Sequence, residues 1–181
     1  MIRLFVGLEL PDALRARLAA LGAGLPGARW VSEENIHLTL RFIGNVDEHQ
    51  AQDLHDALLP VRGETFVLTV DGTGIFETGR KPHTLWAGVR ENEALTRLHD
   101  RVESALVRAG CEPERRKFAP HITLARLRDT PTARLQPYLA AHALVRAEAE
   151  IDHFTLFSSR PGNEEPVYTP EAEYPLTAAQ P

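Results

Sequence analysis

The chain has 181 residues, of which 43% are hydrophobic and 25% charged, and its formal net charge is −5. This composition is typical of a globular protein, and the length suits one domain or two small lobes that share a core. The acidic balance argues against a broad cationic platform for duplex nucleic acid. The single cysteine, Cys111, excludes an intrachain disulfide and a thiolate metal cluster.

The sequence contains no apolar run of the roughly 18 residues that a membrane-spanning helix needs. The opening residues also lack the basic leader and apolar block of a secretory signal peptide. We therefore expect a cytoplasmic protein that is not associated with a membrane.

Apolar periodicity predicts alternating strands and helices along most of the chain. Strand-like patterns cover residues 2–10, 36–43, 65–70, 84–89, 118–127, 144–158 and 167–176, with a short extended piece at 29–31. Helical patterns cover 11–21, 47–59, 91–109 and 129–141, and Gly110 closes the third of them. A turn is predicted at 71–74, and the tail at 177–181 is expected to fray.

The order strand, helix, strand, helix occurs twice in this series. It predicts two related halves, divided near residues 60–84, although the halves share little sequence outside short motifs. We therefore expect an α+β protein with a mostly antiparallel sheet and helices on its outer faces.

One four-residue pattern, His, an apolar residue, Thr and Leu, stands at residues 37–40 and again at 121–124. In a strand the His and Thr point to one face and the apolar pair points to the other, toward a core. Two such strands side by side would place two imidazoles and two hydroxyls in one cavity, which suits acid–base work on a phosphate. A third copy at 153–156 shows that strand alternation itself favours the string, so the tetrapeptide alone does not define a site.

Basic residues gather around the second copy of the pattern, in a chain that is acidic overall. They are Arg115, Arg116, Lys117, Arg126 and Arg128. Such a local concentration indicates a small anionic ligand or the end of a nucleic-acid chain.

The residues around the first two copies resemble the two-histidine phosphoesterase superfamily. Within it, they are most similar to the bacterial RNA 2',3'-cyclic phosphodiesterases, historically called 2'-5' RNA ligases. Further similar segments are 3–6, 85–89 and 154–156, followed by Tyr168 and Tyr174, so the resemblance extends from about residue 2 to 176. It implies a bilobed fold, one two-lobed domain over residues 1–181, with the motifs facing each other across a central cleft. The position of His153 is not catalytic in the family's pattern.

Opening a cyclic phosphate needs a base that activates water and an acid that protonates the departing ribose oxygen. Histidine serves both roles near neutral pH because its ordinary pKa is about 6.5. The resemblance suggests His37 as the proton donor and His121 as the proton acceptor, an assignment that the sequence alone does not make. Thr39 and Thr123 would hydrogen-bond the phosphate oxygens, and Arg126 would supply a bidentate contact to a phosphate.

Phe42 is a candidate for stacking on a base, although a place in the core is favoured for it. We expect neither a metal nor another cofactor, because the remaining histidines show no ligand spacing. The implied partners are RNA termini or nucleotides with a 2',3'-cyclic phosphate. No protein partner is implied, and a monomer is expected.

The leading hypothesis is hydrolysis of RNA 2',3'-cyclic phosphate ends to 2'-phosphomonoesters. Reversible 2'-5' RNA ligation would use the same acid–base steps with a 5'-hydroxyl in place of water. Hydrolysis of small cyclic nucleotides is a further alternative. A binding module without turnover is disfavoured, because binding alone would not need two titrating groups.

Overall fold

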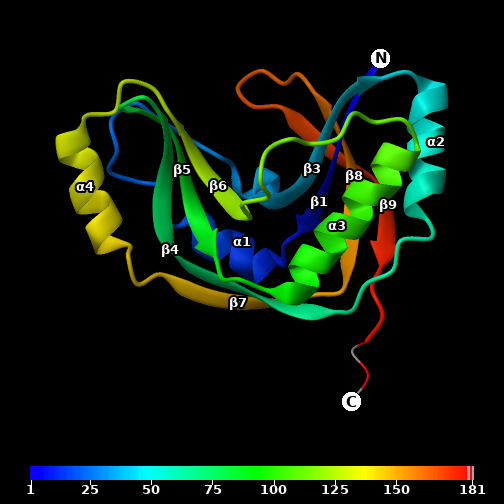
Figure 1. The fold of residues 1–181 in the computed structure, drawn as a ribbon. Helices are drawn as coiled ribbons and strands as arrows, with labels where there is room; N and C mark the ends of the chain where they lie inside the picture. Colours follow the sequence, from blue (N-terminus) through cyan, green and yellow to red (C-terminus); the bar gives the residue numbers. More distant parts are fainter. Residues whose placement is uncertain (179, 181) are drawn as a thin grey trace.

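The computed structural model describes residues 1–178 and 180, and within them it contains nine strands and four α-helices (Figure 1). The strands are β1 (Ile2–Glu9), β2 (Ala28–Trp30), β3 (His37–Val46), β4 (Phe66–Thr78), β5 (Lys81–Val89), β6 (His121–Leu127), β7 (Arg146–Ile151), β8 (His153–Arg160) and β9 (Val167–Pro175). The α-helices are α1 (Asp12–Ala19), α2 (Glu48–Leu58), α3 (Glu93–Arg108) and α4 (Thr132–Ala141), and Glu33–Asn35 forms a short 3-10 helix, η1. Among these described helices, none is long and apolar enough to cross a membrane.

The strands form one curved sheet in the order β7-β4-β5-β6-β3-β1-β8-β9, with β2 added beside β6. Every pairing between these strands is antiparallel. The centre of the sheet is thin, because β3 and β6 join through the single residue pair Leu38 and Ile122. The two halves of the sheet rise on either side of this junction (Figure 1). The predicted α+β fold with a mostly antiparallel sheet is confirmed.

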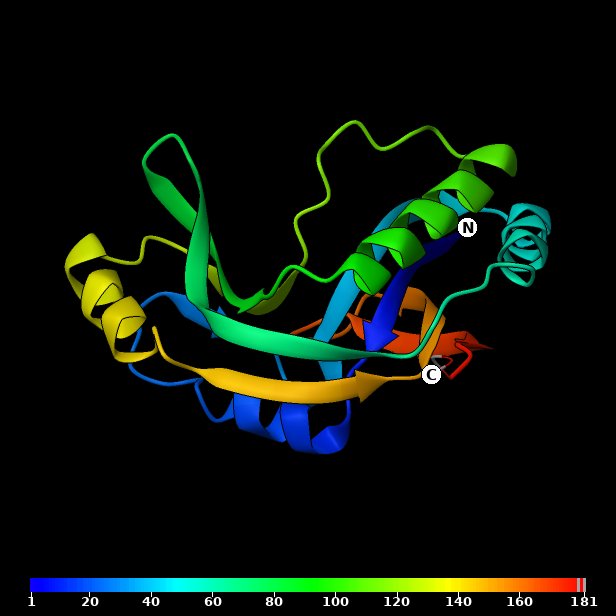
Figure 2. The same cartoon turned by 60° about the horizontal axis from the view of Figure 1, so that its bottom comes forward.

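The two halves of the sheet are interleaved along the chain. Strands β1 and β3 share one half with β8 and β9 from the end of the chain, whereas β4 to β7 form the other. The expected division near residues 60–84 therefore does not separate the halves. The repeated order is nevertheless present, as β1-α1-β3-α2 and β5-α3-β6-α4. Helix α3 crosses over to contact β3 and α2 in the opposite half (Figure 2).

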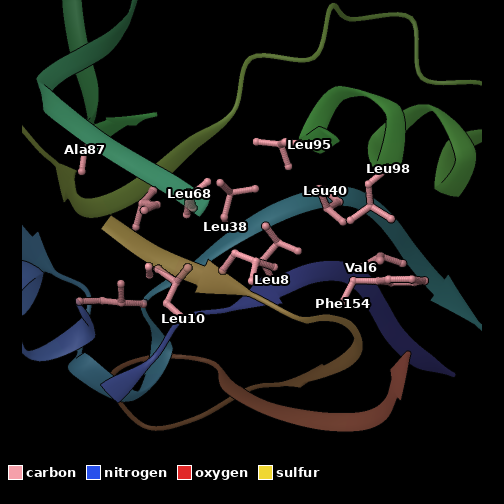
Figure 3. Packing of buried hydrophobic residues seen from close by; sticks show 14 of the residues in the cluster. Val6, Leu8, Leu10, Leu38, Leu40, Leu68, Ala87, Leu95, Leu98 and Phe154 are labelled. Atoms are coloured by element: carbon pink, nitrogen blue, oxygen red, sulfur yellow. The ribbon is translucent and has the colours of Figure 1, made fainter. Parts of the chain in front are cut away.

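The core lies on the face of the sheet that carries the apolar residues of the two motifs. Leu38 and Leu40 of β3 are buried in one cluster with Leu95 and Leu98 of α3 (Figure 3). Helix α3 presents its leucines at helical spacing on one side, as the sequence predicted. Burying each leucine contributes about 1.5–3 kcal/mol, which fixes the face that β3 turns inward. The intervening Thr39 is thereby directed to the opposite face.

Residues 71–74 form no turn, contrary to the prediction. Strand β4 continues through them by a register shift between Val70 and Thr73, and Gly72 takes a φ of +72° there. An Asp-Gly pair is favourable both in a β-bulge and in a turn, so the local sequence could not distinguish the two structures.

The region predicted as one strand at 144–158 is broken at Asp152 into two strands in different halves of the sheet. Strand β7 pairs with β4, whereas β8 pairs with β1. The tail was predicted to fray, and this prediction is wrong at Thr177. The amide of Thr177 donates a hydrogen bond to the Gly63 carbonyl at 3.0 Å. Residues 179 and 181 of that tail lie outside the described residues.

Candidate active site

A cavity of about 720 Å³ lies at the junction of β3 and β6. Its walls come from β1, β2, η1, β3, β6, β8, β9 and the loop between β8 and β9. The six residues singled out from the sequence all line it: His37, Thr39, Phe42, His121, Thr123 and Arg126. The pairing of Leu38 with Ile122 is the cause, because it sets the two motifs side by side with their polar residues on one face.

The His37 imidazole is held by both of its nitrogens. Its Nδ1 lies 2.7 Å from the Asn35 carbonyl, which only accepts, so the proton sits on Nδ1. Its Nε2 lies 2.9 Å from the Thr39 hydroxyl. A neutral His37 therefore accepts from Thr39 at Nε2, and a protonated one donates to it.

His121 is oriented in the same way. Its Nδ1 donates to the Ala119 carbonyl at 2.8 Å, again two residues earlier in the chain. The Nε2 of each histidine is thus the atom that can transfer a proton, and that of His37 does so from its contact with the Thr39 hydroxyl. This shared tautomer is the arrangement that acid–base chemistry on a common substrate requires.

The pKa of His37 lies below its ordinary value of 6.5. Burial is the main cause, and the positive charges of His121 and Arg126 act in the same direction, while the Asn35 hydrogen bond opposes them. The free protein therefore favours neutral His37 at neutral pH. A proton donor must be charged, and an anionic phosphate in the cavity would favour that charged form.

Two β-bulges reverse the direction in which the side chains after each motif point. In β3 the register with β1 skips Leu40, and in β6 the register with β5 skips Leu124. After each bulge the alternation is inverted, so Phe42 and Arg126 return to the face of the histidines. Each stands five positions after its histidine.

Phe42 is 44% exposed and lines the cavity, so the core position favoured for it from the sequence is wrong. The guanidinium of Arg3 lies 5.0 Å from the centre of its ring. Arg126 donates from Nη1 to the buried Thr84 hydroxyl at 3.0 Å. Sequence reasoning missed Arg3 and Arg29, which also line the cavity and whose only local signal is a charge within a predicted extended segment.

The loop between β8 and β9 is tied to η1 by one carboxylate. Glu165 accepts hydrogen bonds from the amide and hydroxyl of Ser32, at 3.1 and 3.0 Å, and from the side-chain amide of Asn35 at 2.9 Å. Asn35 also donates to the Pro166 carbonyl at 2.8 Å. Sequence reasoning predicted only a turn in this loop, because contacts over 130 positions leave no local pattern.

A profile of the 2'-5' RNA ligase superfamily matches residues 10–163 of this chain. The chain belongs to the 2'-5' RNA ligase superfamily. The resemblance recognised in the sequence is thereby confirmed, and its motifs extend beyond the matched segment at both ends.

Two members of this superfamily illustrate the similarity. The RNA 2',3'-cyclic phosphodiesterase of Thermotoga maritima is 31% identical over 173 residues, covering 92% of this chain and 91% of that protein. The Escherichia coli K12 protein of the same name is 31% identical over 182 residues, covering 97% of each. The crystal structure of E. coli LigT complexed with 3'-AMP matches with a TM-score of 0.80 at 30% identity, over 97% of this chain and 98% of that one.

The third copy of the superfamily's motif string lies away from the cavity, as expected. Thr155 is fully buried, and His153 bonds to Asp152 at 2.7 Å and to Glu9 at 3.2 Å. Glu9, His153 and Glu173 bring their ligand atoms within 4.8 Å of one another. Both imidazole nitrogens are already paired with carboxylates, so we interpret this group as an ion-paired histidine and not as a metal centre.

Proposed function

We propose that this protein hydrolyses RNA 2',3'-cyclic phosphate ends to 2'-phosphomonoesters. The observation that carries the proposal is the matched pair of imidazoles that line one cavity, each of which donates from Nδ1 to a backbone carbonyl and so leaves proton transfer to Nε2. The names of the T. maritima and E. coli relatives support the same activity.

In the proposed reaction, His121 accepts a proton from water as the water oxygen bonds to phosphorus. The bond between phosphorus and the ribose 3'-oxygen breaks, and His37 protonates that oxygen. The phosphate stays on the 2'-oxygen. Thr39 and Thr123 donate hydrogen bonds to the phosphate oxygens that gain charge in the transition state.

Arg126 supports the same step by charge. Its guanidinium stands at the cavity wall, and the bond to Thr84 fixes its direction. Together with Arg3 and Arg29 it offsets Glu164 and Glu165, which also line the cavity. An anionic substrate would therefore be attracted even though the chain is acidic. Phe42, exposed at the wall, is the residue we propose for stacking on the base of the nucleotide.

We further propose that residues 1–181 act as one two-lobed domain and as a monomer in the cytoplasm. Each half of the sheet supplies one histidine, and both halves come from a single interleaved chain. One chain therefore holds a full set of the proposed catalytic groups.

The direct test is turnover of an RNA oligomer that ends in a 2',3'-cyclic phosphate, with chelator present. We expect a 2'-phosphate product and a bell-shaped pH profile for the wild type. His37→Ala and His121→Ala should each lower kcat by at least a hundredfold, whereas His153→Ala, in the third copy, should retain activity. Full activity in the double His37→Ala, His121→Ala variant would refute the proposal. A cyclic mononucleotide measured in parallel decides whether RNA or the small nucleotide is the better substrate.

A further inference from the structure

Arg29 and Arg126 are cross-strand partners at one end of the cavity. They pair directly across β2 and β6, so both side chains lie on the same face of the sheet, and both line the cavity. The described residues bring no carboxylate within ion-pairing distance of either guanidinium. Like charges directly opposite each other destabilise a sheet. An anion bound between the two arginines would relieve this repulsion, so the pair has the chemistry of an anion site.

The β-bulge in β6 sets the distance from this pair to the reacting phosphate. Thr123 pairs with Trp86 and Arg126 pairs with Thr84, two positions apart on β5. Strand rise therefore separates Thr123 from Arg126 by about 7 Å, although they are three positions apart in β6. This separation resembles that of neighbouring phosphates in an extended RNA strand. An anion at Arg126 would thus lie one phosphate along the strand from the phosphate that Thr123 contacts.

The opposite end of the cavity carries Phe42. Because β3 and β6 are antiparallel, Phe42 and Arg126, each five positions after its histidine, lie at opposite ends of the cavity. In a nucleoside 2',3'-cyclic phosphate the base is attached next to the 2'-carbon, and the 5'-carbon is attached next to the 3'-carbon. The two groups therefore leave the ribose on opposite sides of the phosphate. A nucleotide whose base stacks on Phe42 directs its 5'-phosphate toward Arg29 and Arg126.

The place of His37 agrees with this direction. The antiparallel pairing of Leu38 with Ile122 sets His37 opposite Thr123, on the side of the junction that leads to Arg126. The positive charge of Arg126 acts on the His37 imidazole. In the proposed hydrolysis, His37 protonates the departing 3'-oxygen. The 3'-oxygen and the 5'-carbon are on neighbouring sides of the ribose, so the 5'-phosphate lies beyond His37 and toward the two arginines.

We propose that Arg29 and Arg126 form a second phosphate subsite, which binds the phosphodiester on the 5' side of the terminal nucleotide. This inference rests on the proposed function and deepens it, because it assigns the direction in which an RNA strand crosses the cavity. The strand enters past Arg29 and ends with its last base on Phe42. The guanidinium of Arg126 is held by its hydrogen bond to Thr84, whereas Arg29 makes the contact that only a 5'-phosphorylated nucleotide can use.

The first experiment compares two substrates with the same reacting ring. One is adenosine 2',3'-cyclic phosphate with a free 5'-hydroxyl, and the other carries a 5'-methyl phosphate diester, which stands for the RNA strand. The measured quantity is the ratio of kcat/KM for the diester to kcat/KM for the free nucleoside. We expect a ratio of at least ten for the wild type. Arg29→Gln should lower it at least fivefold, Arg29→Lys should retain part of it, and Arg29→Glu should bring it below one.

Two control variants separate the subsite from general effects. Arg134→Gln removes the same charge from an exposed position of α4 outside the cavity lining, and it should leave both kcat/KM and the ratio unchanged. Phe42→Ala should lower kcat/KM for both substrates alike, because both carry the same base, so its ratio should remain that of the wild type. A ratio that falls as far in Phe42→Ala as in Arg29→Gln would contradict the assigned direction of the strand.

The failures of the inference and of the proposed function are distinguishable. A wild-type ratio near one would overturn the inference, as would an unchanged ratio in Arg29→Gln and Arg29→Glu with both variants folded by circular dichroism. Absence of hydrolysis of either substrate by the wild type would instead refute the proposed function.

A second experiment needs no turnover. Calorimetry compares the binding of adenosine 2'-monophosphate with that of adenosine 2',5'-bisphosphate. We expect the wild type to bind the bisphosphate at least tenfold more tightly, with an advantage that shrinks as salt is added. Arg29→Gln should reduce the advantage at least fivefold, whereas Arg134→Gln should preserve it. Equal affinity of the wild type for the two ligands, or an advantage that Arg29→Gln leaves intact, would overturn the inference.

Discussion

The side-chain amide of Asn35 donates a hydrogen bond to the carboxylate of Glu165 at 2.9 Å, while its backbone carbonyl accepts one from His37 at 2.7 Å. Asn35 therefore connects the loop between β8 and β9 to an imidazole of the cavity. In the proposed hydrolysis, Glu165 has no contact with the reacting atoms. It acts as a positioning residue, because it holds the short helix η1 from which the carbonyl of Asn35 reaches His37.

Removing the Glu165 carboxylate should therefore weaken catalysis through His37. We expect Glu165→Ala to lower kcat/KM about tenfold, since losing roughly 1–2 kcal/mol of hydrogen bonding loosens the carbonyl that sets the tautomer. Glu165→Gln should lose less, because one oxygen can still accept. Glu150→Gln is the matched control, because this exposed carboxylate of β7 lies outside the cavity lining and its replacement should leave kcat/KM unaltered.

The pH profile of Glu165→Ala distinguishes a loss of His37 positioning from a general destabilisation of the protein. If Glu165 acts through His37, Glu165→Ala should displace the limb of the kcat/KM profile that reports His37 and should leave the other limb in place. A uniform loss at every pH, with both limbs unmoved, would contradict the positioning role.

The pKa of His37 should respond to ligands in a defined direction. Burial and the positive charges of His121 and Arg126 lower it in the free protein, so its NMR titration midpoint should fall below 6.5. A bound 2'-phosphate adds negative charge beside the imidazole and should raise the midpoint. The variant His37→Ala identifies the resonance by its disappearance. A midpoint at or above 6.5 in the free protein would show that burial does not dominate at this site.

The same shift has a consequence for stability. Since the folded pKa of His37 is lowered, the unfolded chain takes up the proton first as pH falls, and the folded state loses stability below about 6.5. His37→Ala should remove this contribution, so the variant's free energy of unfolding should decline less than the wild type's between pH 7 and pH 5. A steeper decline in the variant would show that protonation of His37 does not destabilise the folded state.

Local pattern was sufficient for much of the fold and for the core of the candidate site. The alternation within each four-residue motif buries Leu38 or Ile122 and turns the histidine of that motif to the opposite face of its strand, without any long-range information. The pairing of β3 with β6 then places the two histidines side by side. Helix α3 was equally readable, since its leucines recur at 3.6-residue spacing.

The features that could not be predicted from the sequence depend on contacts with residues far away along the chain. The orientation of Phe42 follows from a bulge in the pairing of β3 with β1, and a register shift has no counterpart in the hydrophobic pattern of one strand. Glu165 has a positioning role only because the chain brings it into contact with Ser32, more than a hundred residues earlier in the sequence. The interleaving of the halves has the same origin, as β8 is placed by β1 and not by β7.

The three threonines of the repeated string allow a matched comparison. Thr39 and Thr123 line the cavity, whereas Thr155 is fully buried and its hydroxyl has no hydrogen-bond partner among the described residues. We expect Thr123→Val to lower kcat by about tenfold or more, through loss of a donor to the transition state. Thr155→Val should leave kcat unchanged and raise the free energy of unfolding by about 1 kcal/mol, because an unsatisfied buried hydroxyl is replaced by a methyl group. Chemical denaturation and steady-state kinetics on the same preparations measure both effects, and a loss of activity in Thr155→Val would contradict the assignment.

His153 should stabilise the fold with the opposite pH dependence from His37. Burial alone would lower its pKa, but the hydrogen bonds that His153 donates to Asp152 and Glu9 and the nearby charge of Glu173 together raise it. The stabilisation by protonated His153 is therefore fully present below pH 6.5 and is lost as pH rises through its elevated folded pKa. The imidazole is 26% exposed and solvent screens the pairs, so we expect about 0.5–1 kcal/mol. Urea unfolding at pH 6 and pH 9 measures it: His153→Gln should be less stable than the wild type at pH 6 and nearly equal to it at pH 9. Glu173→Gln should show a smaller loss of the same sign, and a deficit in His153→Gln that grows toward alkaline pH would refute the charge-based account.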